Sequence, residues 1–177
     1  MDDRRWFLRE KYIMYLPNLM LEEEMKAQVI EAPSLTSATY DKSLFIAGGI
    51  TNCPNWQHEL IDALQNLEIT IYNPRREKFP ADNPVAAREQ IAWEFNKLRK
   101  ANYVSFWFCQ ETLCPITLFE LGATMERTDN CIIGVHPEYK HRYSVEVQAN
   151  LKNHTVLYSL SDLAYEITHG MTKEYLF

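Results

Sequence analysis

The stretch YVSFWFCQETLCPITLFELG, residues 103–122, decides the fold, because it joins a buried strand to a helix through a short loop. Its first seven residues are mostly aromatic or β-branched without clean alternation, which is typical of a parallel strand that is buried on both faces. Pro115 suits the first position of a helix, where its missing N–H costs nothing. The stretch therefore predicts a strand, a loop and a helix, the unit from which α/β sheets are built.

The helix after this strand carries one acid, Glu120, beside an apolar stripe formed by Leu118, Leu121 and Met125. An arbitrary helix glutamate is most often a solvated surface residue. Glu120, however, follows the carboxyl end of a buried strand, the edge at which open α/β sheets bind ligands. We therefore interpret Glu120 as a candidate nucleophile. Gly122 costs about 1 kcal/mol in a helix relative to alanine, so we expect backbone or ligand to approach closely there.

The rest of the chain repeats the alternation of strands and helices. Further strands are expected at residues 28–32, 44–49, 69–73, 131–135 and 154–158, and further helices at 56–67, 84–101 and 159–170. This order predicts an α/β fold, a flavodoxin-like doubly wound parallel sheet of about five strands with helices on both faces. Right-handed crossovers place the carboxyl ends of all strands at one edge. Gly48–Gly49, Asn73–Arg76 and Cys109–Glu120 should meet there.

Composition limits the class of protein. The 177 residues fit one domain, which we assign to residues 28–177, after an N-terminal arm at residues 1–27. A net charge of −6 disfavours a nucleic acid polymer as partner. The chain has neither an apolar run long enough for a membrane span nor a signal peptide pattern, so a cytoplasmic protein with no membrane association is expected. The four cysteines form no C-x-x-C pair, which predicts reduced thiols and no metal site; no cofactor is expected.

Several polar residues near the expected sheet edge are candidates for binding. Gly48 and Gly49 end a strand and permit a tight turn with close backbone approach to a ligand. Arg75 and Arg76 follow another strand and could bind a phosphate or a carboxylate, although a solvated surface pair is an equal alternative. The helix at 84–101 has a predicted core stripe, with a second stripe of Gln90, Glu94 and Lys97 beside it. The predicted core stripe contains Ala87, Ile91, Phe95 and Leu98.

Four ordered motifs together resemble the nucleoside 2-deoxyribosyltransferase family, most closely its nucleoside 2-deoxyribosyltransferase-like branch. The motifs are Ala-Gly-Gly at 47–49, Asn-Pro-Arg-Arg at 73–76, Gln-x-x-Trp-Glu at 90–94, and Pro-Ile-Thr-Leu-x-Glu-Leu-Gly at 115–122. The likeness spans roughly residues 28–167. Where the classical enzymes carry an aspartate six residues before the nucleophile, this chain has Cys114.

The resemblance implies a double displacement at the anomeric carbon of a deoxynucleoside. Glu120 would attack C1′ and form a covalent glycosyl ester, as in retaining glycosidases. Glu94 would give a proton to the departing base, and Gln90 would read the edge of that base. The substrate-binding residues implied with these two acids are Gly48, Gly49, Asn73, Arg75, Arg76, Gln90, Pro115 and Thr117. The partners implied are a nucleoside or nucleotide and a free nucleobase, together with further copies of the chain in a homo-oligomer, a dimer or larger.

Two alternatives to a transferase remain open. A deoxynucleoside 5′-monophosphate N-glycosidase would use the same glutamate and deliver the sugar to water. A nucleotide-sensing module would keep the pocket without turnover, yet such a module needs neither acid.

Overall fold

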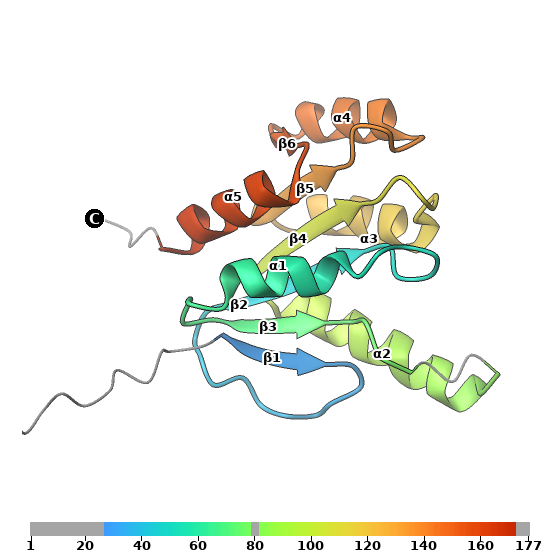
Figure 1. Ribbon diagram of the computed structural model, residues 1–177, viewed down its shortest axis with the longest axis vertical. Helices are drawn as coiled ribbons and strands as arrows, with labels where there is room; N and C mark the ends of the chain where they lie inside the picture. The colour runs from blue at the N-terminus through green and yellow to red at the C-terminus, as the bar shows by residue number, and fades with distance from the viewer. Residues whose placement is uncertain (1–26, 79–81, 173–177) are drawn as a thin grey trace, which may run out of the picture.

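A computed structural model describes residues 27–78 and 82–172, and these residues form a parallel sheet between two layers of helices (Figure 1). The predicted arm at 1–27 lies, apart from Ala27, outside the described residues. The strands of this part of the chain are β1 (Gln28–Glu31), β2 (Ser43–Gly48), β3 (Thr70–Asn73), β4 (Tyr103–Phe108), β5 (Cys131–Val135) and β6 (Val156–Leu157).

The sheet order is β1-β3-β2-β4-β5-β6, and every described pair of neighbouring strands is parallel. Without β1 this is the flavodoxin-like order, so the predicted fold class is confirmed. The described residues form six strands, one more than the sheet of about five that was expected, and the strand expected at 28–32 joins the sheet as β1 beside β3 at its outer edge. The direction of winding reverses between β2 and β4, and ligands of doubly wound sheets bind where this happens.

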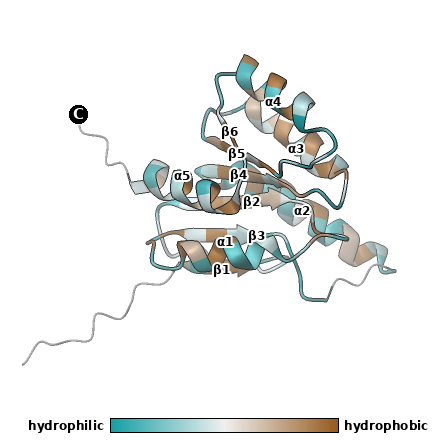
Figure 2. Cartoon of the chain, turned by 45° about the horizontal axis from the view of Figure 1, so that its top comes forward, coloured by the Kyte–Doolittle hydropathy of each residue, from teal (hydrophilic) through white to brown (hydrophobic). Residues whose placement is uncertain are grey.

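The helices cover both faces of the sheet. They are α1 (Trp56–Leu64), α2 (Pro84–Lys100), α3 (Pro115–Met125), α4 (Arg142–Leu151) and α5 (Leu160–Thr172). Helices α1 and α5 contact each other in front of the sheet in Figure 1, and α2 and α3 lie behind it. Helix α4, which covers β5 and β6, lies between the strands expected at 131–135 and 154–158, where the sequence predicted no helix. Each helix mixes hydrophilic and hydrophobic residues in Figure 2, as expected for helices that bury one face.

The central strands are buried on both faces, as their continuous apolar pattern predicted. In β2, residues 43–47 are all buried, and in β4, residues 104–108 are all buried. The core between the sheet and the helices contains large side chains such as Phe45, Tyr72 and Phe106. This rigid core fixes the carboxyl ends of β2 and β4, from which the candidate site is built.

Two packing predictions were wrong. Ile91 and Phe95 were expected in the core, but they are 66% and 54% exposed, whereas Gln90 and Trp93 on the same helix are buried. The buried face of α2 is rotated because Trp93 packs on the aromatic rings of Phe45 and Tyr72. Gly122 was expected to allow a close approach, but a Cβ added there would meet nothing within 4 Å.

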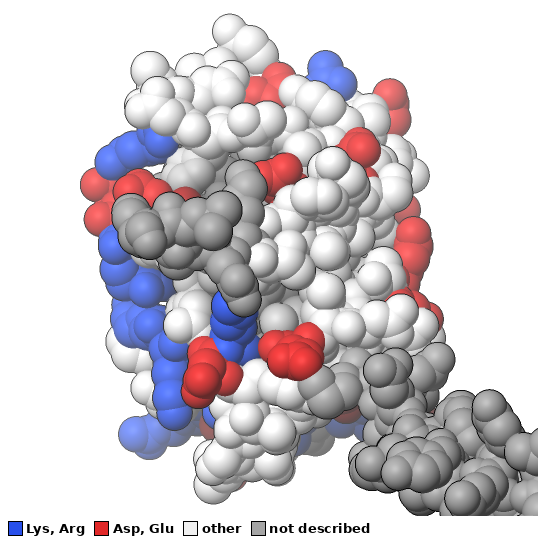
Figure 3. Space-filling model, turned by 90° about the vertical axis from the view of Figure 1, so that its left-hand side faces the viewer, with Lys and Arg blue, Asp and Glu red and all other residues white. Residues whose placement is uncertain are grey.

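The helices and the surface charge bear on two expectations from the sequence, that the chain does not cross a membrane and does not bind a nucleic acid polymer. Among the described residues, no helix is long and apolar enough to cross a membrane. On the face drawn in Figure 3, lysine and arginine side chains gather along one margin with acidic side chains among them. The absence of a nucleic acid partner stays a prediction.

Candidate active site

A cavity of about 430 Å³ opens where the ends of β2 and β4 meet helices α2 and α3. Its walls come from segments that are far apart in the chain: the end of β2 and its loop, Pro74, Glu94, and the loop and first turns of α3. Six of the residues predicted from the sequence line it: Gly48, Gly49, Glu94, Pro115, Thr117 and Glu120. The cavity thus lies at the reversal point of the sheet, where the fold predicts a ligand site.

Glu120 and Glu94 are the two acids among the described residues that line the cavity. Burial raises the pKa of Glu120 to about 7, and the nearby Glu94 carboxylate contributes to this rise. Burial also raises the pKa of Glu94, and a hydrogen bond from Gln90 opposes that rise. Two interacting acids lose their protons in separate steps. The pair therefore passes through a state with one proton and one negative charge, as a nucleophile with a proton donor requires.

Gln90 is buried and lies behind Glu94 instead of lining the cavity. Its side-chain Nε2 donates to Glu94 Oε1 at 2.7 Å and to the carbonyl oxygen of Pro74 at 2.7 Å. Both hydrogens of the amide are thereby used within the protein. The arrangement fits Gln90 as the residue that orients Glu94.

The turn after β2 is held closely against its neighbours. The carbonyl oxygen of Gly49 accepts hydrogen bonds from Trp56 Nε1 at 2.8 Å and from Gln57 Nε2 at 3.2 Å. A Cβ added at Gly48 would lie 2.5 Å from the carbonyl oxygen of Trp107 and 2.3 Å from the Trp56 ring. Only glycine fits this position without a shift of the neighbouring strand, so the cavity wall at β2 is bare backbone.

Asn73, Arg75 and Arg76 do not line this cavity. They line a second hollow of about 480 Å³, which shares Ile50 with the first. The Arg75 guanidinium donates to the carbonyl oxygens of Pro54 and Cys53 and to Gln57 Oε1, at 2.9, 3.3 and 2.9 Å. Arg75 therefore fastens the loop between β2 and α1.

The cysteines differ from the prediction of reduced thiols, because Cys53 and Cys109 form a disulfide. Strands β2 and β4 are neighbours, so the loop after β2 lies beside the end of β4 although the two residues are 56 positions apart. Cys114 lies near both and is a free thiol that lines the cavity. Sequence spacing could not reveal this cluster, since only the sheet order brings Cys53 to the other two.

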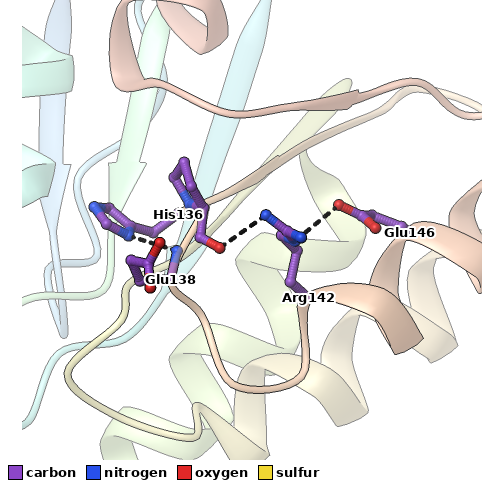
Figure 4. A network of polar contacts seen from close by, with 5 residues as sticks. His136, Glu138, Arg142 and Glu146 are labelled. Carbon is purple, nitrogen blue, oxygen red and sulfur yellow. Dashed lines mark hydrogen bonds and ion pairs between the residues drawn. The ribbon is translucent and has the colours of Figure 1, made fainter.

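The loop before α3 is supported from the neighbouring strand. The Tyr139 hydroxyl donates to the carbonyl oxygen of Leu113 at 2.7 Å. Tyr139 belongs to the loop between β5 and α4, which a polar network fixes (Figure 4). In this network the Glu138 amide donates to His136 Nδ1, and Arg142 donates to the carbonyl of Pro137 and pairs with Glu146. The network thereby supports the loop from which Tyr139 binds Leu113, two residues before the start of α3.

A comparison with protein families places these residues in a known context. A family model described as nucleoside 2-deoxyribosyltransferase like matches residues 41–139, more than half of the chain. The match runs from the start of β2 to Tyr139 and includes every residue that lines the cavity. No curated protein matches the chain.

Proposed function

Since the chain belongs to the nucleoside 2-deoxyribosyltransferase-like family, we propose that it exchanges the base of deoxynucleosides through a glycosyl ester on Glu120. The observation that carries this proposal is the pair of acids with raised pKa values, Glu94 and Glu120, in one cavity. Raised pKa values in a cleft are typical of catalytic acids. They favour an enzyme over a sensing module, which would gain nothing from two buried acids.

In the first half-reaction, the ionised carboxylate of Glu120 attacks C1′ of the sugar. The bond between C1′ and the base nitrogen breaks, and its electron pair leaves with the base, which takes a proton from Glu94. In the second half-reaction, a nitrogen of a new base attacks C1′, gives its proton to Glu94 and releases Glu120. Each step inverts C1′, so the product keeps the configuration of the substrate.

The substrate that fits this proposal best is a nucleoside without a 5′-phosphate. Arg75 is bound to backbone carbonyls and to Gln57, and neither Arg75 nor Arg76 lines the cavity that holds the acids. The alternative, a 5′-monophosphate N-glycosidase, would require a phosphate to be held beside the glycine turn. The cavity volume lies in the range of about 300–1,000 Å³ that is usual for small-molecule sites.

We also propose a homo-oligomer that acts in the cytoplasm. The outer surfaces of α2 and α3 expose Ile91, Phe95, Ile116 and Phe119, each more than half accessible. Exposed apolar groups of this size on two helices of the same sheet face favour an interface. Ile116 also lines the cavity, so this surface adjoins the candidate site.

The test is to incubate the protein with deoxyadenosine and other deoxynucleosides, with and without a free base, and to separate the products. Base exchange supports a transferase, and release of free sugar supports a hydrolase. Glu120→Gln is nearly isosteric but cannot form the ester, so it should lower turnover by orders of magnitude while the fold persists. Mass spectrometry of quenched wild type should find the glycosyl group on the peptide that contains Glu120. Retention of more than a few per cent of activity in Glu120→Gln would refute the assignment.

A further inference from the structure

Three cysteines meet beneath the glycine turn of the cavity: Cys53, Cys109 and Cys114. Their sulfur atoms all lie within 4.8 Å of one another. Cys53 follows β2, Cys109 follows β4 and Cys114 precedes α3, so the cluster joins the three segments that form one wall of the cavity. Nothing in the proposed transfer reaction uses a thiol.

The surrounding backbone is shaped around these sulfur atoms. A Cβ added at Gly49 would lie 2.5 Å from Cys53 Sγ, 2.7 Å from Cys109 Sγ and 3.0 Å from Cys114 Sγ. Position 49 therefore has no room for a side chain because three sulfurs occupy the space. The Cys114 thiol itself donates a hydrogen bond to the carbonyl oxygen of Thr112 at 3.6 Å.

Separate contacts fix the backbone on the different sides of the cysteine cluster. Arg75 binds the carbonyl oxygen of Cys53, and Trp56 and Gln57 bind that of Gly49. Cys114 has a left-handed backbone, with φ of 46°, at the start of α3. A non-glycine residue in this conformation costs free energy, so its position is imposed by the surrounding structure. The backbone around the cluster is thus held in place, and only side chains have to turn once the Cys53–Cys109 bond is reduced.

We propose that, when Cys53 and Cys109 are reduced, the three thiols bind one thiophilic divalent cation such as Zn²⁺. Tetrahedral zinc at about 2.3 Å from each sulfur separates the sulfurs by roughly 3.8 Å, so the bonded sulfurs of Cys53 and Cys109 must move apart after reduction, while the Cys114 sulfur lies within 4.8 Å of both. The Cα atoms of Cys53 and Cys109 are 6.6 Å apart. Rotation of a side chain can therefore move their sulfurs apart without a shift of the backbone.

The chemistry balances as follows. A thiol reductant supplies two electrons and two protons to the Cys53–Cys109 bond and is itself oxidised to a disulfide. The three thiols then release three protons and donate three sulfur lone pairs to the cation. Cytosolic thiols are normally kept reduced, so the metal-binding form belongs to the compartment that the sequence predicts. A small-molecule disulfide takes up two electrons by thiol–disulfide exchange and is released as two thiols, which re-forms the Cys53–Cys109 bond, removes two of the three ligands and releases the cation.

A bound cation would tie the glycine turn to the start of α3. Both segments line the cavity, and α3 carries Glu120. Cys53 is half-buried, which leaves an entry path, whereas Cys109 and Cys114 are buried. Three protein ligands leave the fourth coordination position of the cation open. Cys114 is the ligand that lines the cavity.

The experiment uses the full chain, reduced with a phosphine and desalted without oxygen. Zn²⁺ affinity is measured by competition with a chromogenic chelator, and Cd²⁺ is added separately to count thiolate ligands by their charge-transfer absorption. Wild type should bind one ion per chain with three thiolates. Cys53→Ser and Cys114→Ser should each bind at least tenfold more weakly and lose about a third of the absorption. Cys131→Ser is the matched control, because Cys131 is a buried free thiol outside the cluster, and its binding should equal that of wild type.

A second measurement on wild type alone guards against variants that do not fold. Zn²⁺ should protect Cys53, Cys109 and Cys114 together from alkylation, as read by peptide mass mapping, and excess chelator should restore their reaction. Protection that fails, or a Cys53→Ser affinity equal to that of wild type, would overturn the proposal. So would re-formation of the Cys53–Cys109 disulfide at an equal rate with and without Zn²⁺, since that would make the pair a redox site only.

Discussion

At the scale of single residues, the ionisation of Glu120 governs the proposed reaction. The attacking form is the carboxylate, so activity requires loss of its proton. Burial and the charge of Glu94 raise the pKa of Glu120 from its ordinary range to about 7. An isolated surface glutamate would already be ionised well below neutral pH.

The charge of Glu94 raises the pKa of Glu120 only when Glu94 is ionised, so neither acid holds a proton above a pH of about 7. We therefore predict that kcat/KM of wild type, measured on deoxyadenosine with a series of buffers, falls as the pH rises through about 7, because no proton is left for the departing base. In Glu94→Gln the acid that shares the proton with Glu120 is gone, so this falling limb should disappear and the remaining low activity should rise with pH as Glu120 ionises. Burial remains in this variant without the charge of Glu94, so the rising limb should lie below 7 and above the ordinary range of a glutamate.

The control for this profile is Glu89→Gln, because Glu89 is exposed on the same helix and does not line the cavity. Its profile should superimpose on that of wild type. A falling limb near pH 7 that persists in Glu94→Gln would show that Glu94 is not the proton donor.

At the scale of elements, the sequence predicted strands and strand ends better than the buried faces of helices. Glu120 was singled out because a buried strand and the helix after it can be read locally, whereas the role of Glu94 was implied by the family resemblance. Both line the cavity, and their roles stay proposals. The prediction of the buried face of α2 was wrong because Ile91 and Phe95 are apolar yet exposed, whereas Trp93 is the buried residue. Helix α4 was missed because only Val145 and Ala149 of its ten residues are buried, which leaves a weak apolar period. In both helices, tertiary contacts that the sequence does not show determine which residues are buried.

Two glycines that look alike in sequence should respond in opposite ways to alanine. At Gly48 an added Cβ would lie 2.5 Å from a backbone oxygen of β4, so Gly48→Ala should lower the free energy of unfolding by about 1–3 kcal/mol. At Gly122 the space is open and the residue is helical, so Gly122→Ala should raise it by about 0.5–1 kcal/mol. Urea unfolding of both variants beside wild type measures the difference. A loss of stability in Gly122→Ala would mean that α3 is packed against something else.

The loop between β2 and α1 provides a further prediction at this scale. Arg75→Ala removes three charge-assisted hydrogen bonds to that loop, so stability should fall by about 1–3 kcal/mol. Because the guanidinium fastens protein groups, kcat/KM should fall by the same factor for deoxyadenosine and for its 5′-monophosphate. Kinetics on both substrates in wild type and variant are the measurement. A loss confined to the monophosphate would assign Arg75 to phosphate binding and would favour the hydrolase.

At the scale of the whole molecule, the topology brings the candidate site together. The reversal between β2 and β4 leaves the end of β2 uncovered by a crossover connection, and α2 and α3 flank the gap. The alternation of strands and helices predicted this edge from sequence. It did not predict the disulfide or the third cysteine beside it, because residues 53 and 109 become neighbours only once the strand order is known.

The exposed surface of α2 and α3 gives the last prediction. Phe119, at 76%, and Ile116, at 66%, are exposed apolar groups on α3, and Ile116 also lines the cavity. A second copy of the chain that covers them would bury apolar area and shield the mouth of the site from water. We expect wild type to be a dimer or larger in size-exclusion chromatography with light scattering, and Phe119→Glu to shift it toward a monomer. Tyr165→Glu is the matched control, since Tyr165 is 63% exposed on α5, which lies on the opposite face of the sheet from α2 and α3 (Figure 1), and it should leave the mass unchanged. A wild type that is already monomeric at high concentration would refute the interface, and equal shifts in both variants would place it elsewhere.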